Sequence, residues 1–168
     1  MLLNDSKMKY QSIYLAFFSL GFSEARFTNL GIEEFYIKKC EEKIVYTTDH
    51  GEICDMRSLE VVMDTEENKN YIGCVFRELG YFNAKGQFDK QALIKDYHQA
   101  GVKNRDQAVL ESYQSCMQHY GPTTNPMKIL DCVTQDKDFP KVMNARRDRN
   151  SKWKPDWMVA HCGAKKLF

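Results

Sequence analysis

The chain has 168 residues, a formal net charge of +1 at pH 7 and 43% hydrophobic residues. This length fits one domain with a modest core. The near-neutral charge gives no electrostatic reason to expect nucleic acid or a membrane surface as a partner.

Residues 1–25 have the three parts of a secretory signal peptide. Lys7 and Lys9 form a basic start, residues 13–22 are an apolar run, and residues 23–25 (SEA) have small residues where cleavage needs them. A buried helix or a membrane anchor is the alternative, but the run is too short to span a bilayer. We therefore predict a cleaved signal, an extracellular mature protein and no membrane insertion.

The remainder, residues 26–168, is predicted to form a single all-α domain. Apolar residues recur at steps of three and four, and no sustained two-residue alternation occurs. The first helix is expected at residues 30–42, where Ile32 and Phe35 share one face. A short apolar element is expected next, at residues 56–63.

The central helix has the clearest signals in the chain. Thr65 can cap its N-terminus, its apolar face runs from Tyr71 to Leu79, and Gly80 offers a left-handed stop. A turn at residues 83–86 (NAKG) then leads into the next helix.

Two capping signals and a glycine stop place the next two helices. Asp89 is predicted to cap a helix that ends near Gly101. Asn104, with Gln107 three residues later, forms a predicted capping box for the helix that follows. Three helices and an aromatic tail complete the chain, at residues 105–120, 126–132, 141–149 and 152–162.

All the cysteines follow the predicted cleavage point. An even number in a secreted chain indicates a disulfide framework, although spacing alone leaves many pairings open. Zinc binding and catalysis are the alternatives, but no Cys-x-x-Cys pair exists and the four histidines are scattered. The six are Cys40, Cys54, Cys74, Cys116, Cys132 and Cys162.

The region around the central helix resembles the insect odorant-binding protein family. Cys74 lies in a helix, and Leu79-Gly80, an aromatic residue, a glycine turn and another helix follow it. The usual family pattern has a second cysteine four residues earlier, where this chain has Asn70. The resemblance covers residues 30–162 in order and spacing.

One branch of that family, the D-seven salivary proteins of blood-feeding flies, is more similar. Its members also have a cysteine soon after the first and a C-terminal extension with a cysteine of its own, as Cys54 and Cys162 are placed here. The resemblance implies a disulfide-stapled bundle of about seven to eight short helices with that extension. It also implies the bridges Cys40–Cys74, Cys54–Cys162 and Cys116–Cys132.

The resemblance implies a pocket that captures host mediators in saliva: biogenic amines in some members, leukotrienes or thromboxane in others. An amine needs buried carboxylates. In the family these lie three residues apart on one late helix, where this chain has Asn144 and Arg147. Because Arg146 and Arg149 add positive charge, an anionic eicosanoid is favoured over an amine.

Aromatic and methionine side chains are the expected pocket walls, together with two polar residues of the late helix. Most such stripes are ordinary core, and we expect this of Phe35 and Met117. The predicted ligand-binding residues are Tyr36, Tyr71, Tyr113, Met143, Asn144, Arg147 and Trp153.

Two other functions remain open at this point. An odorant or pheromone carrier would use the same pocket with a neutral ligand, and a secreted inhibitor would act through protein–protein contacts. No nucleophile–base pair, phosphate-binding loop or metal motif stands out, so we expect no enzymatic activity, no catalytic residue, no cofactor and no bound metal. We expect a monomer.

Overall fold

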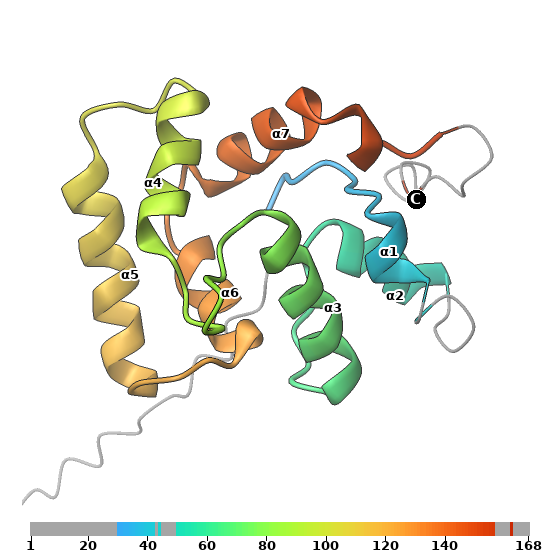
Figure 1. The fold of residues 1–168 in the computed structure, drawn as a ribbon, viewed down its shortest axis with the longest axis horizontal. Helices are drawn as coiled ribbons and strands as arrows, with labels where there is room; N and C mark the ends of the chain where they lie inside the picture. Colours follow the sequence, from blue (N-terminus) through green and yellow to red (C-terminus); the bar gives the residue numbers. More distant parts are fainter. Residues whose placement is uncertain (1–29, 43, 45–49, 157–161, 163–168) are drawn as a thin grey trace, which may run out of the picture.

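The computed structural model describes residues 30–42, 44, 50–156 and 162, and within them it is helical (Figure 1). These residues contain no β-strand, only an isolated antiparallel bridge between Phe82 and Phe88. The predicted all-α class is confirmed. The elements are α1 (Lys38–Glu41), α2 (His50–Arg57), α3 (Glu66–Glu78), α4 (Lys90–Gln99), α5 (Asp106–Tyr120), α6 (Pro126–Thr134), α7 (Phe139–Arg149) and the 3-10 helix η1 (Ser151–Trp153).

The predicted cap and stop of the central helix, α3, are both present. The Thr65 hydroxyl accepts a hydrogen bond from the backbone N–H of Asn68 at 3.1 Å. At the other end, Gly80 adopts φ +74°, a left-handed conformation that costs glycine little. Between them, the buried face of α3 includes Tyr71 and Val75.

The chain leaves α3 through a tight turn that leads to α4. The Asn83 side chain accepts hydrogen bonds from the backbone N–H groups of Lys85 and Gln87 at 2.9 and 3.0 Å. The Asp89 carboxylate then caps α4 by accepting from the N–H groups of Gln91 and Ala92 at 2.9 and 3.2 Å. The predicted cap at Asp89 is therefore confirmed.

Three predictions about helix boundaries are wrong. Residues 30–37 are not helical, and the helix predicted at 30–42 is reduced to α1. The apolar element predicted at residues 56–63 lies mostly in the connection after α2, where Leu59 has φ +55°. The capping box at Asn104 does not form: this residue has φ +63°, and α5 begins two residues later without a side-chain cap.

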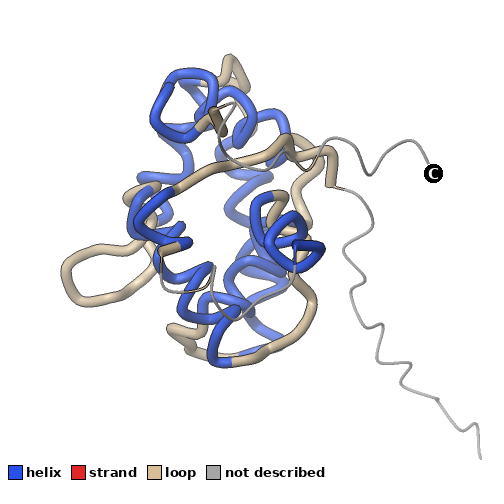
Figure 2. Tube along the Cα trace, turned by 90° about the vertical axis from the view of Figure 1, so that its right-hand side faces the viewer, coloured by secondary structure: helices blue, strands red, loops and turns tan. Residues whose placement is uncertain are grey.

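The helices pack around a common core (Figure 2), with α6 between α3 and α5 and with α7 packed on α4 (Figure 1). Phe76 of α3 is fully buried and lies against three aromatic rings of the α3–α4 connection. Its ring centroid is 5.9 Å from that of Tyr81, 5.8 Å from Phe82 and 6.2 Å from Phe88. This packing holds the α3–α4 connection in place. Phe88, at the end of this connection, lines the groove described in the next section.

Three disulfides staple the fold together. The bridges link α1 to α3, α2 to the C-terminal segment, and α5 to α6, and they are the pairings that the resemblance implies. They are Cys40–Cys74, Cys54–Cys162 and Cys116–Cys132.

Two predictions concern parts of the chain that the structure leaves out. The signal peptide at residues 1–25 lies outside the described residues, as do residues 157–161 of the aromatic tail, which include Trp157. The tail residue Trp153 is described, and it is buried at the end of η1. No helix in the described ranges has both the length and the apolar character needed to cross a bilayer.

Candidate functional site

A groove of about 910 Å³ lies between the start of α4, the second half of α5 and the connection that follows α5. Apolar and polar side chains both line it. Those on which the argument depends are Phe88, Lys90, Tyr113, Met117, Pro122 and Thr124.

The floor of the groove is aromatic. The rings of Phe88 and Tyr113 stack with centroids 4.9 Å apart and an interplanar angle of 22°. Met117, one helical turn after Tyr113, lines the same groove. Burial raises the pKa of Tyr113 to about 12, so its phenol stays neutral at physiological pH. The floor therefore suits an apolar chain or ring.

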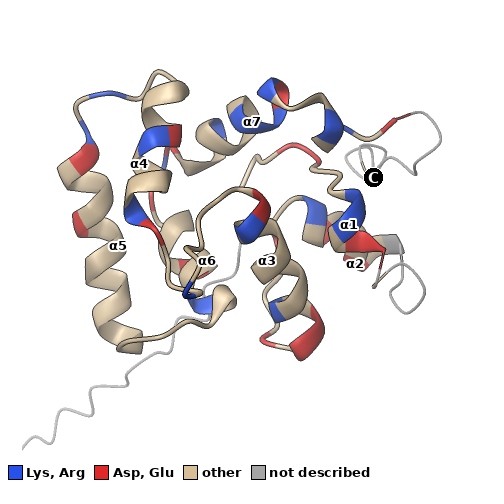
Figure 3. Ribbon diagram, in the orientation of Figure 1, with Lys and Arg blue, Asp and Glu red and all other residues tan. Residues whose placement is uncertain are grey.

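The charge of the groove is positive. The Nζ of Lys90 lies 5.5 Å from the centroid of the Tyr113 ring. No carboxylate lines the groove in the described part of the chain, and the second half of α5 has no lysine, arginine, aspartate or glutamate (Figure 3). An anion can therefore find a partner here, whereas an ammonium ion would lack the carboxylate that its burial requires.

Four of the predicted ligand-binding residues lie together elsewhere, where α7 and η1 meet residues 30–37. The backbone N–H of Tyr36 donates to the carbonyl of Trp153 at 2.8 Å. The Asn144 side chain accepts from the N–H of Glu33 at 2.7 Å and donates to the carbonyl of Gly31 at 3.0 Å. These contacts hold the N-terminal segment against α7.

The fourth of these residues, Arg147, is paired with carboxylates. Its guanidinium forms ion pairs with Glu33 and Asp148. It lines a smaller hollow of about 440 Å³, together with Glu34 and Lys154. Charges of both signs surround this hollow, so it has no clear preference for an anion.

The other arginines of α7 are also paired. Arg146 binds the fully buried carboxylate of Asp96 and lies 5.5 Å from the ring of Trp153. Arg149 lies 3.8 Å from Asp96. The cationic edge expected on α7 is thus largely neutralised within the fold.

The other three predicted ligand-binding residues lie apart from this group on α7 and η1. Tyr113 lies in the groove, as described above. Met143 is fully buried in the core. Tyr71 is also buried, and its hydroxyl has no hydrogen-bond partner among the described residues. Burial raises the pKa of Tyr71 well above its usual value, so the unpartnered group is a neutral hydroxyl. Within the residues that the structure describes, the seven predicted ligand-binding residues therefore do not line one common cavity.

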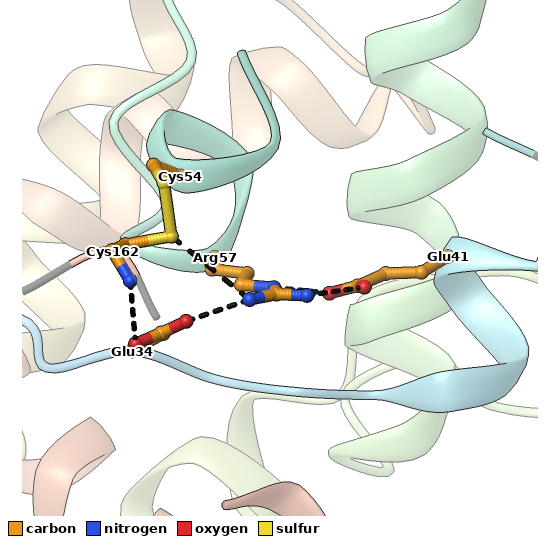
Figure 4. Close-up of a disulfide and its surroundings, with 5 residues drawn as sticks. All are labelled: Glu34, Glu41, Cys54, Arg57 and Cys162. Carbon is orange, nitrogen blue, oxygen red and sulfur yellow. Dashed lines mark hydrogen bonds and ion pairs between the residues drawn. A yellow bond between two sulfur atoms is a disulfide. The ribbon is translucent and has the colours of Figure 1, made fainter. Parts of the chain in front are cut away.

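A buried ion-pair cluster lies beside the Cys54–Cys162 bridge (Figure 4). Arg57 donates to Glu41 at 2.6 and 2.8 Å and to Glu34 at 2.6 Å. Burial lowers the pKa of Arg57, but hydrogen bonds and charges of the two carboxylates raise it overall. Glu34 also accepts from the N–H of Cys162 at 3.1 Å. We assign this cluster a structural role.

The described residues include one close group of possible metal ligands, and it is unsuitable for a metal. Cys116, Asp131 and Cys132 lie close together, but their two sulfur atoms are joined in a disulfide. Thiolates, which are the form that binds metals, are therefore not available. The Asp131 carboxylate instead accepts from the Tyr120 hydroxyl at 2.6 Å.

Sequence reasoning missed Lys90 and Phe88 as site residues. Two signals were available in the sequence. Phe88 and Lys90 lie on either side of the Asp89 cap, and the second half of the helix at residues 106–120 has no aspartate, glutamate, lysine or arginine. That this helix, α5, faces them becomes apparent only in the fold.

The fold and groove define a small, helical, disulfide-stapled protein of the ligand-binding kind. Residues 33–136 match the PBP/GOBP family. A short form salivary protein of the D7 type from Culex quinquefasciatus is 67% identical over 161 residues, which is 96% of this chain and 100% of that protein. A long form salivary protein of the D7 type from Aedes albopictus is 25% identical over 118 residues, which is 66% of this chain and 35% of that protein.

The chain therefore belongs to the PBP/GOBP family of odorant-binding proteins, in its D7 salivary branch. The resemblance inferred from the cysteine pattern is confirmed. The match to the family ends at residue 136, before α7 and Cys162, which form the C-terminal extension.

Proposed function

We propose that this protein is secreted in saliva, binds an anionic and partly apolar host mediator of the eicosanoid class, and so opposes haemostasis and inflammation. Membership of the D7 branch supports a salivary small-ligand binder. Binding would be stoichiometric and would involve no chemical step.

The observation that carries the choice of ligand is the charge of the α4–α5 groove. Its floor is formed by Phe88, Tyr113 and Met117, and Lys90 is its cation. An eicosanoid would place its hydrocarbon on this floor and its carboxylate within reach of the lysine. A biogenic amine would meet a lysine where it needs a carboxylate, so amines are expected to bind weakly or not at all.

Isothermal titration of the oxidised protein with a cysteinyl leukotriene, a thromboxane analogue and serotonin tests the proposal. We expect one-to-one binding of a lipid and no binding of serotonin. The replacement Lys90→Gln should weaken the binding of the lipid by roughly tenfold or more, because a charge-assisted contact is lost. Lys95→Gln removes the same charge from another face of α4 and should leave the affinity unchanged.

The same titration tests the site predicted on α7. If Arg147→Ala weakens the binding of the lipid and Lys90→Gln does not, the ligand occupies the hollow between α7 and residues 30–37 instead. Tight binding of serotonin would overturn the anionic ligand. Equal affinity for a lipid acid and its methyl ester would favour a carrier of neutral odorants, and failure to bind any small molecule would favour a surface-acting inhibitor.

A further inference from the structure

A second hollow, of about 590 Å³, lies on the other side of the α3–α4 connection from the groove. It lies between α3, the turn at residues 82–86 and the start of α6. Three of its lining residues, Asn70, Arg77 and Thr124, are exposed and have side chains that can form hydrogen bonds.

Arg77 differs from the other arginines that the structure describes. Each of the others forms an ion pair with at least one carboxylate, as Arg57, Arg105 and Arg147 do. No hydrogen bond or ion pair joins the Arg77 side chain to any described residue. Its guanidinium lies beside Gly73, where an added Cβ would be 3.6 Å from Nη1.

The other groups of this hollow also favour an anion. No carboxylate lines it within the described residues, and Lys69, on its wall, is already paired with Glu66 and Asp64. The amide of Asn70 and the hydroxyl of Thr124 have no partner among the described residues. A guanidinium, an amide and a hydroxyl are the donors that carboxylates and phosphates accept from.

The hollow adjoins the α4–α5 groove. Thr124 lines both. Phe82 lines the hollow and Phe88 lines the groove, and these two residues form the β-bridge at the base of the turn. The two depressions therefore flank one turn, with a cation in each.

We propose that Arg77, with Asn70 and Thr124, is a second anion subsite, and that the preferred ligand is an amphiphile with a negative group at each end of its apolar chain. This inference rests on the proposed function, since the groove must first bind the apolar chain of the ligand. One end pairs with Lys90, the middle crosses the aromatic floor and Thr124, and the other end pairs with Arg77. A guanidinium recognises a carboxylate with two parallel hydrogen bonds, which gives this end directionality.

A series of linear dicarboxylic acids tests the inference, with the monocarboxylic acid of each length as reference. The protein is the oxidised chain, and binding is measured by isothermal titration. At one chain length, we expect the diacid to bind at least about tenfold more tightly than its monoacid. In Arg77→Gln this ratio should fall to about one while monoacid affinity is retained. Lys95→Gln, which removes one positive charge elsewhere, should preserve the ratio.

The outcomes separate this inference from the proposed function. Monoacid binding with no diacid advantage at any length, or an advantage that survives Arg77→Gln, overturns the second subsite and leaves the groove proposal standing. Failure of the wild-type protein to bind any monoacid or diacid overturns both. Loss of monoacid binding in Arg77→Gln would show that Arg77, and not Lys90, holds the first carboxylate, and would likewise overturn the two-ended assignment.

Discussion

Arg57 shows how one buried charge can organise several segments. The guanidinium connects α2 to α1 through Glu41 and to the extended N-terminal segment through Glu34. Only about 4% of its side chain is exposed, so Glu34 and Glu41, in place of water, accept the hydrogen bonds of its guanidinium. A buried ion pair contributes little relative to a well-packed apolar pair, but removal of one partner leaves the other charge buried and unpaired.

Replacing Arg57→Met is therefore expected to destabilise the fold by roughly 3–5 kcal/mol. The measurement is urea unfolding of the oxidised protein. Arg149→Met, at an exposed site on α7, is the matched control and should change the free energy of unfolding by no more than about 0.5 kcal/mol. Equal losses in the two variants would contradict a special role for the buried cluster.

At the same scale, the charges of the site were the hardest feature to predict. The sequence shows that α7 is rich in arginine, but not that Glu33 and Asp96 neutralise those arginines across long separations. Conversely, Lys90 and Arg77 have no unusual sequence context. Whether a cation is free depends on which carboxylates the fold brings beside it.

Local capping signals predicted the starts of α3 and α4, but not the start of α5. Thr65 and Asp89 cap α3 and α4 as predicted, because each accepts backbone N–H groups within three residues of itself. Residues 30–37 could not be predicted in this way. The N–H of Phe35 bonds to the carbonyl of Arg57, and that of Tyr36 to Trp153, so distant elements hold this segment extended.

The Asp89 cap also supports the groove, because Lys90 is the first residue of α4. Replacing Asp89→Ala should destabilise the protein by about 1 kcal/mol, since two N–H groups lose their acceptor. Asp89→Asn retains a capping oxygen and should recover most of this loss. Thermal unfolding of the three proteins checks the prediction, and a variant order with Asn no better than Ala would contradict it.

On the scale of the whole molecule, the disulfides close loops of very different length. Cys54–Cys162 joins residues 108 apart, whereas Cys116–Cys132 joins residues 16 apart. The sequence alone left the pairing open, and the family resemblance implied the set that the structure contains. In the chain-entropy account, a longer loop restricts the unfolded chain more and so stabilises the fold more.

Removing Cys54–Cys162 by paired Cys→Ala replacement should therefore cost about 4–5 kcal/mol, and removing Cys116–Cys132 about 3 kcal/mol. Urea unfolding of both variants under oxidising conditions gives the comparison. The reverse order would indicate that native-state contacts of the α5–α6 bridge, and not loop entropy, dominate.

The long bridge has a further consequence for what happens when a protease cuts the chain. The turn at residues 83–86 is exposed and contains Lys85, a cleavage point for trypsin-like enzymes. After such a cut, Cys40–Cys74 lies wholly in one fragment and Cys116–Cys132 wholly in the other. Cys54–Cys162 alone crosses the cut, so a nicked molecule remains one covalent unit until it is reduced.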